Sequence, residues 1–135
     1  SIRRQRQMCI RDSVLGTPVY YAQPNGAILA VMQRVFFASG GRLHGKPAAS
    51  VAVCRRGGAS AAFQTLNLFY GIAGMPVAGS QYWNIAYGAA PGEVAQDAEG
   101  LQTMRLLGRN LAWMAKNLKT GVPAREPWQM TNFIR

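Results

Sequence analysis

At 135 residues, the chain is long enough for one domain with a buried core and too short for two. Its hydrophobic content of 49% and its 15 glycines exclude an intrinsically disordered protein and fit a folded α/β domain. The net charge of +10 excludes an acidic surface, and no apolar run reaches the roughly 18 residues of a membrane-spanning helix.

The positive charge is gathered at the start of the chain and scattered elsewhere. Four arginines and one aspartate in residues 1–13 give +3, and the remaining +7 is spread singly. A nucleic-acid-binding protein would collect such charge on one face, with aromatic residues between the cations. The pattern therefore favours a solvated basic surface. An anionic small ligand would fit the same excess of positive charge.

Residues 1–13 do not resemble the rest of the chain. They lack helical and alternating periodicity, and the string QMCIRDS resembles translated linker sequence. We expect a non-native or disordered basic segment, and the alternative is a basic arm that binds polyanions. Cys9 and Cys54 form no metal-binding motif, and this polar start lacks the apolar middle of a secretory signal, so a reducing cytoplasm is the expected compartment.

Residues 14–26 carry the clearest structural and functional signals in the sequence. Residues 14–21 have the β-branched and aromatic content of a buried strand, and Pro18 should end its pairing near Thr17 because proline has no N–H. Pro24-Asn25-Gly26 is a turn, and Asn25 can cap a helix over 27–38. Ligands of parallel sheets bind where strands end and helices begin, so we expect a functional loop from Pro18 to Asn25.

A second strand over 47–54 is continuously apolar, which predicts burial on both faces. It ends in CRRGGAS, which opens a helix over 61–73. Glycines let backbone N–H groups approach a ligand, while Arg55, Arg56 and the helix start supply positive charge. The turn is therefore a candidate anion or polar-ring site. The alternative is an ordinary turn with solvated arginines.

The last part of the chain predicts a third strand over 75–80, a long loop over 81–92 and an amphipathic helix over 101–118. Aromatic residues in the loop could cover a planar ligand, contact another subunit or simply pack. Residues 121–135 read as an extended tail. The only histidine, His44, reads as a surface residue without a catalytic role. The resulting βαβαβα order predicts a parallel sheet with right-handed crossovers.

Several stretches together resemble a known family. They are GTPVYYAQPNGAILAVMQRVF, CRRGGAS, SQYWNIAYGAAPGEVAQDAEGLQTMRLLGRNLAW and TNFIR. Over residues 14–135 the chain is similar to NADPH-dependent FMN reductase-like flavoproteins, including their iron-sulfur flavoprotein branch. The resemblance implies a flavodoxin-like, three-layer αβα fold with a parallel sheet that lacks its first strands. Residues 14–120 would be the carboxyl-terminal part of that domain, without the loop that holds the FMN phosphate and without an iron-sulfur cluster.

The resemblance implies FMN as cofactor and NAD(P)H as reductant, with hydride transfer from nicotinamide to flavin. The implied cofactor-binding residues fall in three groups: Pro18, Val19, Tyr20, Tyr21, Ala22 and Asn25 at the isoalloxazine edge; Cys54, Arg55, Arg56, Gly57 and Gly58 on the other side of the ring; and Tyr82 and Trp83 near the flavin or a subunit interface. Arg55 or Arg56 could stabilise reduced flavin, and Cys54 fits a small strand-end residue better than a redox nucleophile.

No catalytic side chain and no metal site are expected. The family resemblance implies a homodimer or homotetramer, with no membrane and no specific nucleic acid as partner. The unpaired edge of strand 14–17 is a predicted association surface. Two other functions remain open: a flavodoxin-like electron carrier that NAD(P)H does not reduce, and a basic protein that binds polyanions.

Overall fold

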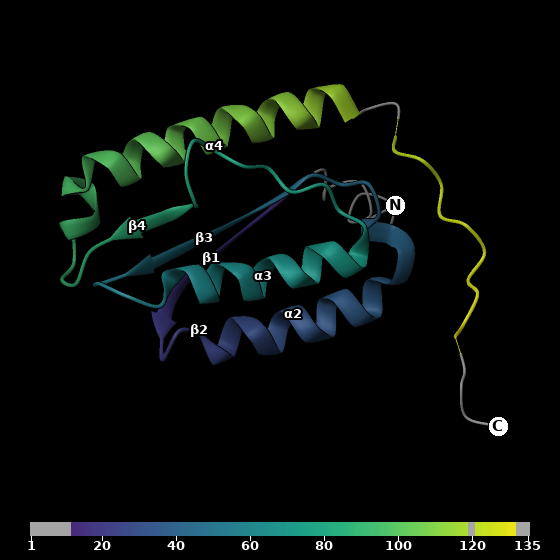
Figure 1. Ribbon diagram of the computed structural model, residues 1–135, viewed down its shortest axis with the longest axis horizontal. Coiled ribbons are helices and arrows are strands. Elements are labelled where there is room, and N and C mark those ends of the chain that lie inside the picture. The colour runs from purple at the N-terminus through teal and green to yellow at the C-terminus, as the bar shows by residue number, and fades with distance from the viewer. Residues whose placement is uncertain (1–11, 119–120, 132–135) are drawn as a thin grey trace, which may run out of the picture.

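The computed structural model describes residues 12–118 and 121–131. It has three layers, with a four-stranded sheet between helices on its two faces (Figure 1). The strands are β1 (Ser13–Tyr20), β2 (Gln23–Pro24), β3 (Ala48–Cys54) and β4 (Ile85–Tyr87), and the α-helices are α2 (Gly26–Ser39), α3 (Ala59–Ala73) and α4 (Ala98–Asn117). Short 3₁₀ helices span Gly40–Leu43 and Glu93–Gln96.

The sheet is mainly parallel. Its order is β2-β1-β3-β4, with β1 parallel to β3, β3 parallel to β4, and β2 antiparallel to β1. The central strand, β3, has no exposed residue, as its continuous apolar sequence predicts for a strand covered on both faces. The prediction of an α/β fold with a parallel core is therefore confirmed.

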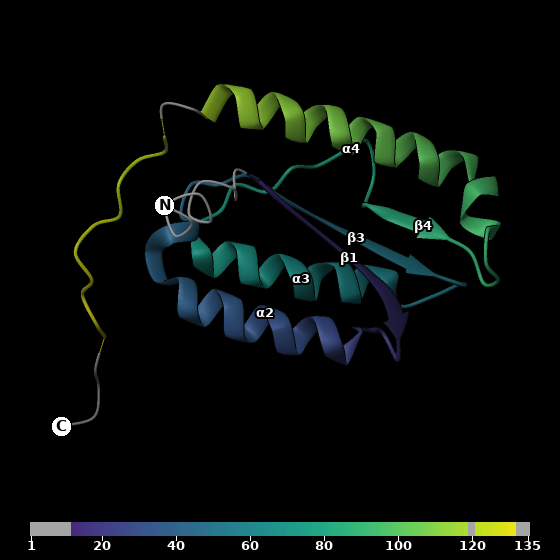
Figure 2. The same cartoon turned by 180° about the vertical axis from the view of Figure 1, so that it is seen from behind.

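The two helical layers pack on alternate residues of β3. On one face, Ala52 and Cys54 contact Ala59 and Ala62 of α3. On the other face, Ala49 packs with Leu107 and Leu111 of α4. Figure 2 shows the same arrangement from behind, with α2 beside α3 and α4 alone on the opposite side of the sheet. None of the helices in the described residues is both long and apolar enough to cross a membrane.

The pairing of the first strand, expected to end near Thr17, extends slightly further. The ladder with β3 runs from Ser13 to Pro18, and β1 continues to Tyr20. Proline is tolerated at this position because no described strand lies on the other side of β1 there. The missing N–H of Pro18 therefore removes no hydrogen bond between strands. Ser13, expected to lie outside the domain, is the first paired residue.

The predicted third strand over 75–80 is also different in the structure. Only Val77 bridges to β3, opposite Ala48, and the strand proper is β4, whose first residue, Ile85, lies opposite Ala52. Between these two pairs the segment advances by eight positions (77 to 85) while β3 advances by four (48 to 52). The extra residues, 78–84, form an outward excursion that spans the end of the predicted strand and the start of the predicted loop and carries Tyr82 and Trp83.

The face of β1 that points away from α2 and α3 is uncovered in the described part of the chain. Val14, Gly16, Pro18 and Tyr20 alternate along it and are all exposed. The outer edge of β1 pairs with β2 only at Val19 and Tyr20. The exposed edge that the sequence implied is therefore present among the described residues, and its role in association stays a prediction.

Candidate functional site

The carboxyl ends of three parallel strands lie at one edge of the sheet. β1 ends at Tyr20, β3 at Cys54 and β4 at Tyr87. The last two ends are tied together, because Gly88 donates its N–H to the carbonyl oxygen of Cys54 at 3.0 Å. This is the edge at which ligands of open parallel sheets bind.

The predicted loop from Pro18 to Asn25 is a tight hairpin. Tyr20 pairs with Gln23, so the connection is only Tyr21-Ala22, with φ angles of 50° and 60°. Positive φ at two successive residues is usual for a two-residue hairpin, but asparagine and glycine normally occupy it. An L-residue in this region costs about 1–2 kcal/mol. Strain of this kind is typical of functional sites, and the side chain of Tyr21 is fully exposed here.

The start of α3, at Gly58, packs closely against this hairpin. It adopts φ +87°, and a Cβ atom added to it would lie 2.9 Å from the Cα of Ala22 and 3.2 Å from a methyl group of Val19. Only glycine allows the two backbones to approach so closely. The structure therefore brings together the two turns that the sequence singled out, at the ends of neighbouring strands.

The start of α3 adds positive charge to this edge. Gly58 is the N-cap residue, and no side chain caps the helix. The first N–H groups of α3 therefore have no intrahelical acceptor and carry the positive end of the helix dipole. Arg55 and Arg56 lie just before it with exposed side chains. Together these groups favour an anionic or electron-rich ligand.

Two of the predicted site residues have structural roles. The side-chain oxygen of Asn25 accepts the N–H of Ala27 at 2.7 Å, which confirms the predicted cap of α2. The N–H of Asn25 in turn donates to the buried hydroxyl of Thr17 at 2.9 Å, fixing the hairpin to the strand. Cys54 is a free, buried residue in the core cluster with Ala52 and Ala59. Its environment is that of a small packing residue.

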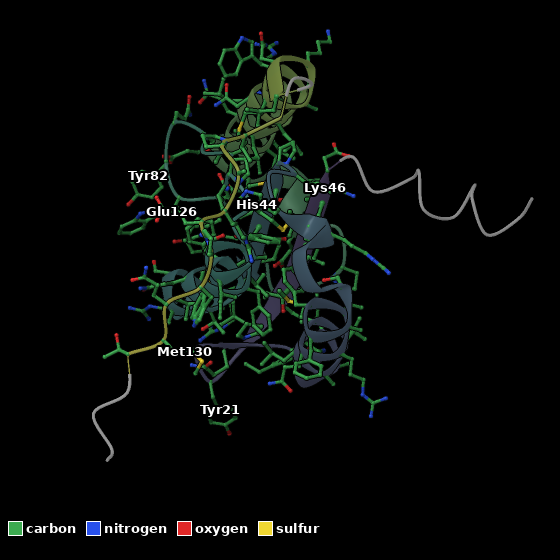
Figure 3. All side chains as sticks on the ribbon, turned by 90° about the vertical axis from the view of Figure 1, so that its right-hand side faces the viewer. Tyr21, His44, Lys46, Tyr82, Glu126 and Met130 are labelled. Atoms are coloured by element: carbon green, nitrogen blue, oxygen red, sulfur yellow. The ribbon has the colours of Figure 1, made fainter. Side chains whose placement is uncertain are left out.

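The aromatic pair Tyr82-Trp83 lies on the outward excursion before β4. The two rings are tilted, with centroids 5.2 Å apart, and both side chains are more than half exposed. Tyr82 lines a cavity of about 240 Å³ with Tyr87, Asp97 and Thr103. Figure 3 shows Tyr82 and Tyr21 at separate places on the surface. Tyr82 therefore does not lie beside the hairpin, and its expected place near the flavin or a subunit interface stays a prediction.

Two carboxylates that the sequence pattern did not single out as functional hold the loop after β4. Glu93 accepts the N–H groups of Ala90 and Ala89, and these hydrogen bonds hold the pKa of its carboxyl below the usual value. Asp97 accepts the N–H of Tyr87 and, three residues before Gly100, caps α4 through the N–H of that glycine. An aspartate just before an apolar helical run is a cap signal that the sequence carried.

Replacing Asp97 by alanine is expected to lower the free energy of unfolding by about 2 kcal/mol, because a helix cap and a bond to the end of β4 are both lost. Asp97→Asn is the matched control. It keeps an acceptor for Gly100 and should cost less than about 1 kcal/mol. Urea denaturation followed by circular dichroism measures both values. Equal losses in the two variants would contradict the capping role.

Among the described residues, no group of three or more histidines, cysteines and carboxylates could hold a metal ion. Cys9 lies outside the described residues, so the structure says nothing of its surroundings.

Comparisons with known proteins point to one family. A sequence profile of the NADPH-dependent FMN reductase family matches residues 13–90. An iron-sulfur flavoprotein of Methanocaldococcus jannaschii is 32% identical over 114 residues, covering 78% of this chain and 59% of the relative. The chain thus spans less than two thirds of the length of this relative.

Solved structures share the fold at low sequence identity. A flavodoxin, WrbA-like protein from Agrobacterium tumefaciens superimposes with a TM-score of 0.64 at 20% identity, over 81% of this chain and 68% of that protein. RosB, solved with 8-demethyl-8-formylriboflavin-5'-phosphate, gives a TM-score of 0.62 at 17% identity, over 88% of this chain and 52% of RosB. Because the family profile matches more than half of its residues, the chain belongs to the NADPH-dependent FMN reductase family, and its fold is flavodoxin-like.

Proposed function

We propose that this chain contributes the isoalloxazine-binding part of an FMN-dependent oxidoreductase that takes a hydride from NAD(P)H. The observation that carries the proposal is the contact of the Tyr21-Ala22 hairpin with Gly58 at the carboxyl edge of the sheet. Family membership supports the same ligand class, since the family is named for FMN reduction with NADPH.

The residues at this edge fit a flavin ring in their chemistry. The ring is planar, with carbonyl oxygens and nitrogens that accept hydrogen bonds along one edge. The strained hairpin offers backbone groups and two exposed tyrosines, Tyr20 and Tyr21, to one side of it. Arg55, Arg56 and the uncapped start of α3 offer cationic and N–H donors to the other.

When bound, FMN would supply the redox chemistry itself, by accepting a hydride from nicotinamide. The residues of this chain would bind and orient the ring. Reduction adds negative charge to it, and the guanidinium groups of Arg55 and Arg56 would stabilise that charge. No acid, base or nucleophile is needed for this role, which agrees with a site built from backbone groups and arginines.

Removing either arginine is expected to weaken FMN binding about tenfold, because a hydrogen bond from a charged donor contributes about 1.5 kcal/mol or more. Titration of FMN into the purified chain, followed by quenching of flavin fluorescence, gives the affinity of wild type, Arg55→Ala and Arg56→Ala. Arg109→Ala is the matched control, since Arg109 is exposed on α4, on the opposite side of the sheet.

Saturable quenching that both substitutions at the turn weaken, and the control does not, would support the site. Absence of saturable quenching in the wild-type chain would contradict it for this chain. If FMN binds, addition of NADPH under anaerobic conditions tests the second half of the proposal. Bleaching of bound flavin supports a reductase, whereas unchanged absorbance favours an electron carrier.

A further inference from the structure

The carboxyl-terminal tail is held against the body of the protein by residues 121–125. The guanidinium group of Arg125 donates hydrogen bonds to the carbonyl oxygens of Ala73 at 2.6 Å and Ile72 at 3.4 Å, at the end of α3. These carbonyl groups belong to the last turn of the helix, which carries the negative end of the helix dipole. Val122 packs so closely on the loop before β3 that a Cβ atom added to Gly45 would lie 2.5 Å from one of its methyl groups. The tail therefore has a defined docking site between this loop and the end of α3.

His44 lies at the centre of these contacts. Its Nδ1 atom accepts the Nε–H of Arg125 at 3.2 Å, and its Nε2 atom lies 3.0 Å from the carbonyl oxygen of Pro123. A guanidinium group can only donate and a carbonyl oxygen can only accept, so the ring must carry its hydrogen on Nε2 and none on Nδ1. The docked tail therefore requires a neutral imidazole. His44, which the sequence pattern indicated as a surface residue without a catalytic role, thus holds the tail, and Figure 3 shows the tail passing it towards Glu126 and Met130.

The charged side chains on the elements around His44 are mainly cationic. They are Arg34 on α2, Arg42 and Lys46 on either side of His44 in the chain, and Arg125 and Glu126 in the tail. Helix α3 contributes no charged side chain, and its only tyrosine is buried and hydrogen-bonded to Ala49. A proton on Nδ1 would remove the acceptor of Arg125 and place a second positive charge beside its guanidinium group.

We propose that His44 is a pH-dependent anchor of the tail: the neutral ring holds residues 121–125 in place, and the protonated ring releases them. Histidine ordinarily changes its charge between about pH 5 and 8. His44 is the only histidine of the chain, so release in this range has a single histidine as its source. Because release takes up one proton, the ratio of docked to released tails falls by up to about tenfold for each unit by which the pH is lowered. The proposal does not depend on flavin binding.

Release of the tail would also open a cavity. Arg125 lines a hollow of about 400 Å³ between α2 and α3, together with Phe36, Phe37 and Phe69. When Arg125 leaves its place at the end of α3, the aromatic side chains of this hollow lose its cover. The anchor therefore couples acidification to the exposure of an apolar surface.

NMR spectroscopy of the ¹⁵N-labelled full chain tests this proposal. The ring signals of His44 report its protonation, and heteronuclear NOEs of the backbone amides in residues 121–126 report whether the tail is ordered on the picosecond-to-nanosecond timescale. We expect an ordered tail near pH 7.5 and a mobile tail near pH 5.5. Release of the tail and protonation of the ring should have the same midpoint.

Three variants identify the group that responds to pH. His44→Gln is the matched variant, because its side-chain amide has an oxygen that can accept from Arg125 and an N–H that can donate to Pro123, but it gains no charge. Its tail should stay ordered at both pH values. Arg125→Ala should leave the tail mobile at both. Glu126→Gln removes the neighbouring carboxylate and should keep the wild-type response.

Four results would overturn the proposal. They are a wild-type tail that is mobile near pH 7.5, a wild-type tail that stays ordered after the ring of His44 is protonated, a pH response that persists in His44→Gln, and loss of the response in Glu126→Gln. The comparison of the two midpoints uses only the wild-type chain, so it decides the question even if glutamine fits the site less well than histidine.

Discussion

Replacing Gly58 by alanine is expected to lower the free energy of unfolding by about 3 kcal/mol. At φ +87° an L-residue is strained by about 1–2 kcal/mol. The added Cβ would also lie 2.9 Å from the Cα of Ala22, a backbone atom that cannot move without opening the hairpin. Urea denaturation followed by circular dichroism measures the loss.

The same substitution should reduce FMN affinity more than removal of one arginine does, since it displaces the hairpin from the start of α3. Gly57→Ala is the matched control. A Cβ atom at Gly57 meets nothing within 4 Å, and its φ lies outside the left-handed region. Its effect on stability should stay within about 0.5 kcal/mol. Similar losses at the two glycines would show that the contact with Ala22 is unimportant.

The layered fold could be predicted because each main element carries a strong local signal. The continuous apolar run of β3 specifies a strand covered on both faces. The apolar residues of α2 and α3 specify helices that pack on the sheet, although their low charge does not mean burial all round, since Met32 is the one buried residue of α2. β4 could not be located in the same way. It has only three paired residues, and its earlier bridge at Val77 is separated from it by an excursion that local sequence does not mark.

The sequence predicted that two turns lie together at the carboxyl edge of the sheet, and the structure brings them into contact there. That this edge binds a ligand stays a prediction. The hairpin at Tyr21-Ala22 could not be foreseen, because tyrosine and alanine disfavour positive φ and the surrounding structure imposes it. The direction of Tyr82 likewise depends on the excursion before β4, and its expected place near the flavin or a subunit interface stays a prediction.

The hydrogen bonds that hold the carboxyl-terminal tail could not be predicted from local sequence patterns. His44 and Arg125 are 81 residues apart, and neither belongs to a motif that indicates a partner. Their contact depends on the left-handed Gly74 at the end of α3, where an added Cβ would overlap His44. Contacts between residues so far apart in the sequence can be predicted only when the positions of the helices are known.

Tyr70 is expected to make the stability of the protein depend on pH in the alkaline range. Its side chain is fully buried, and its hydroxyl group donates to the carbonyl oxygen of Ala49 at 3.0 Å. Burial disfavours the charged phenolate and raises the pKa of Tyr70 from 10.0 to about 12. The folded state therefore favours the neutral form, and the unfolded state releases the proton first.

The sign of the effect follows from this difference. The contribution of Tyr70 is fully present below pH 10 and is lost as the pH rises towards 12, by about 3 kcal/mol in total at 1.36 kcal/mol per pKa unit. In Tyr70→Phe the hydroxyl group is absent, so this part of the pH dependence should vanish, at a cost near neutral pH of about 1–2 kcal/mol for the lost hydrogen bond.

Urea denaturation of wild type and Tyr70→Phe at several pH values between neutrality and pH 11 measures the difference. The two proteins differ only at residue 70, so the difference between the two curves isolates Tyr70. Tyr87→Phe, at a half-exposed position, is the matched control and should follow the wild-type curve. If stability falls equally with pH in wild type and Tyr70→Phe, burial of the phenol does not govern alkaline unfolding. Convergence of the two curves above pH 10 is the expected result, because the advantage of the buried neutral phenol disappears there.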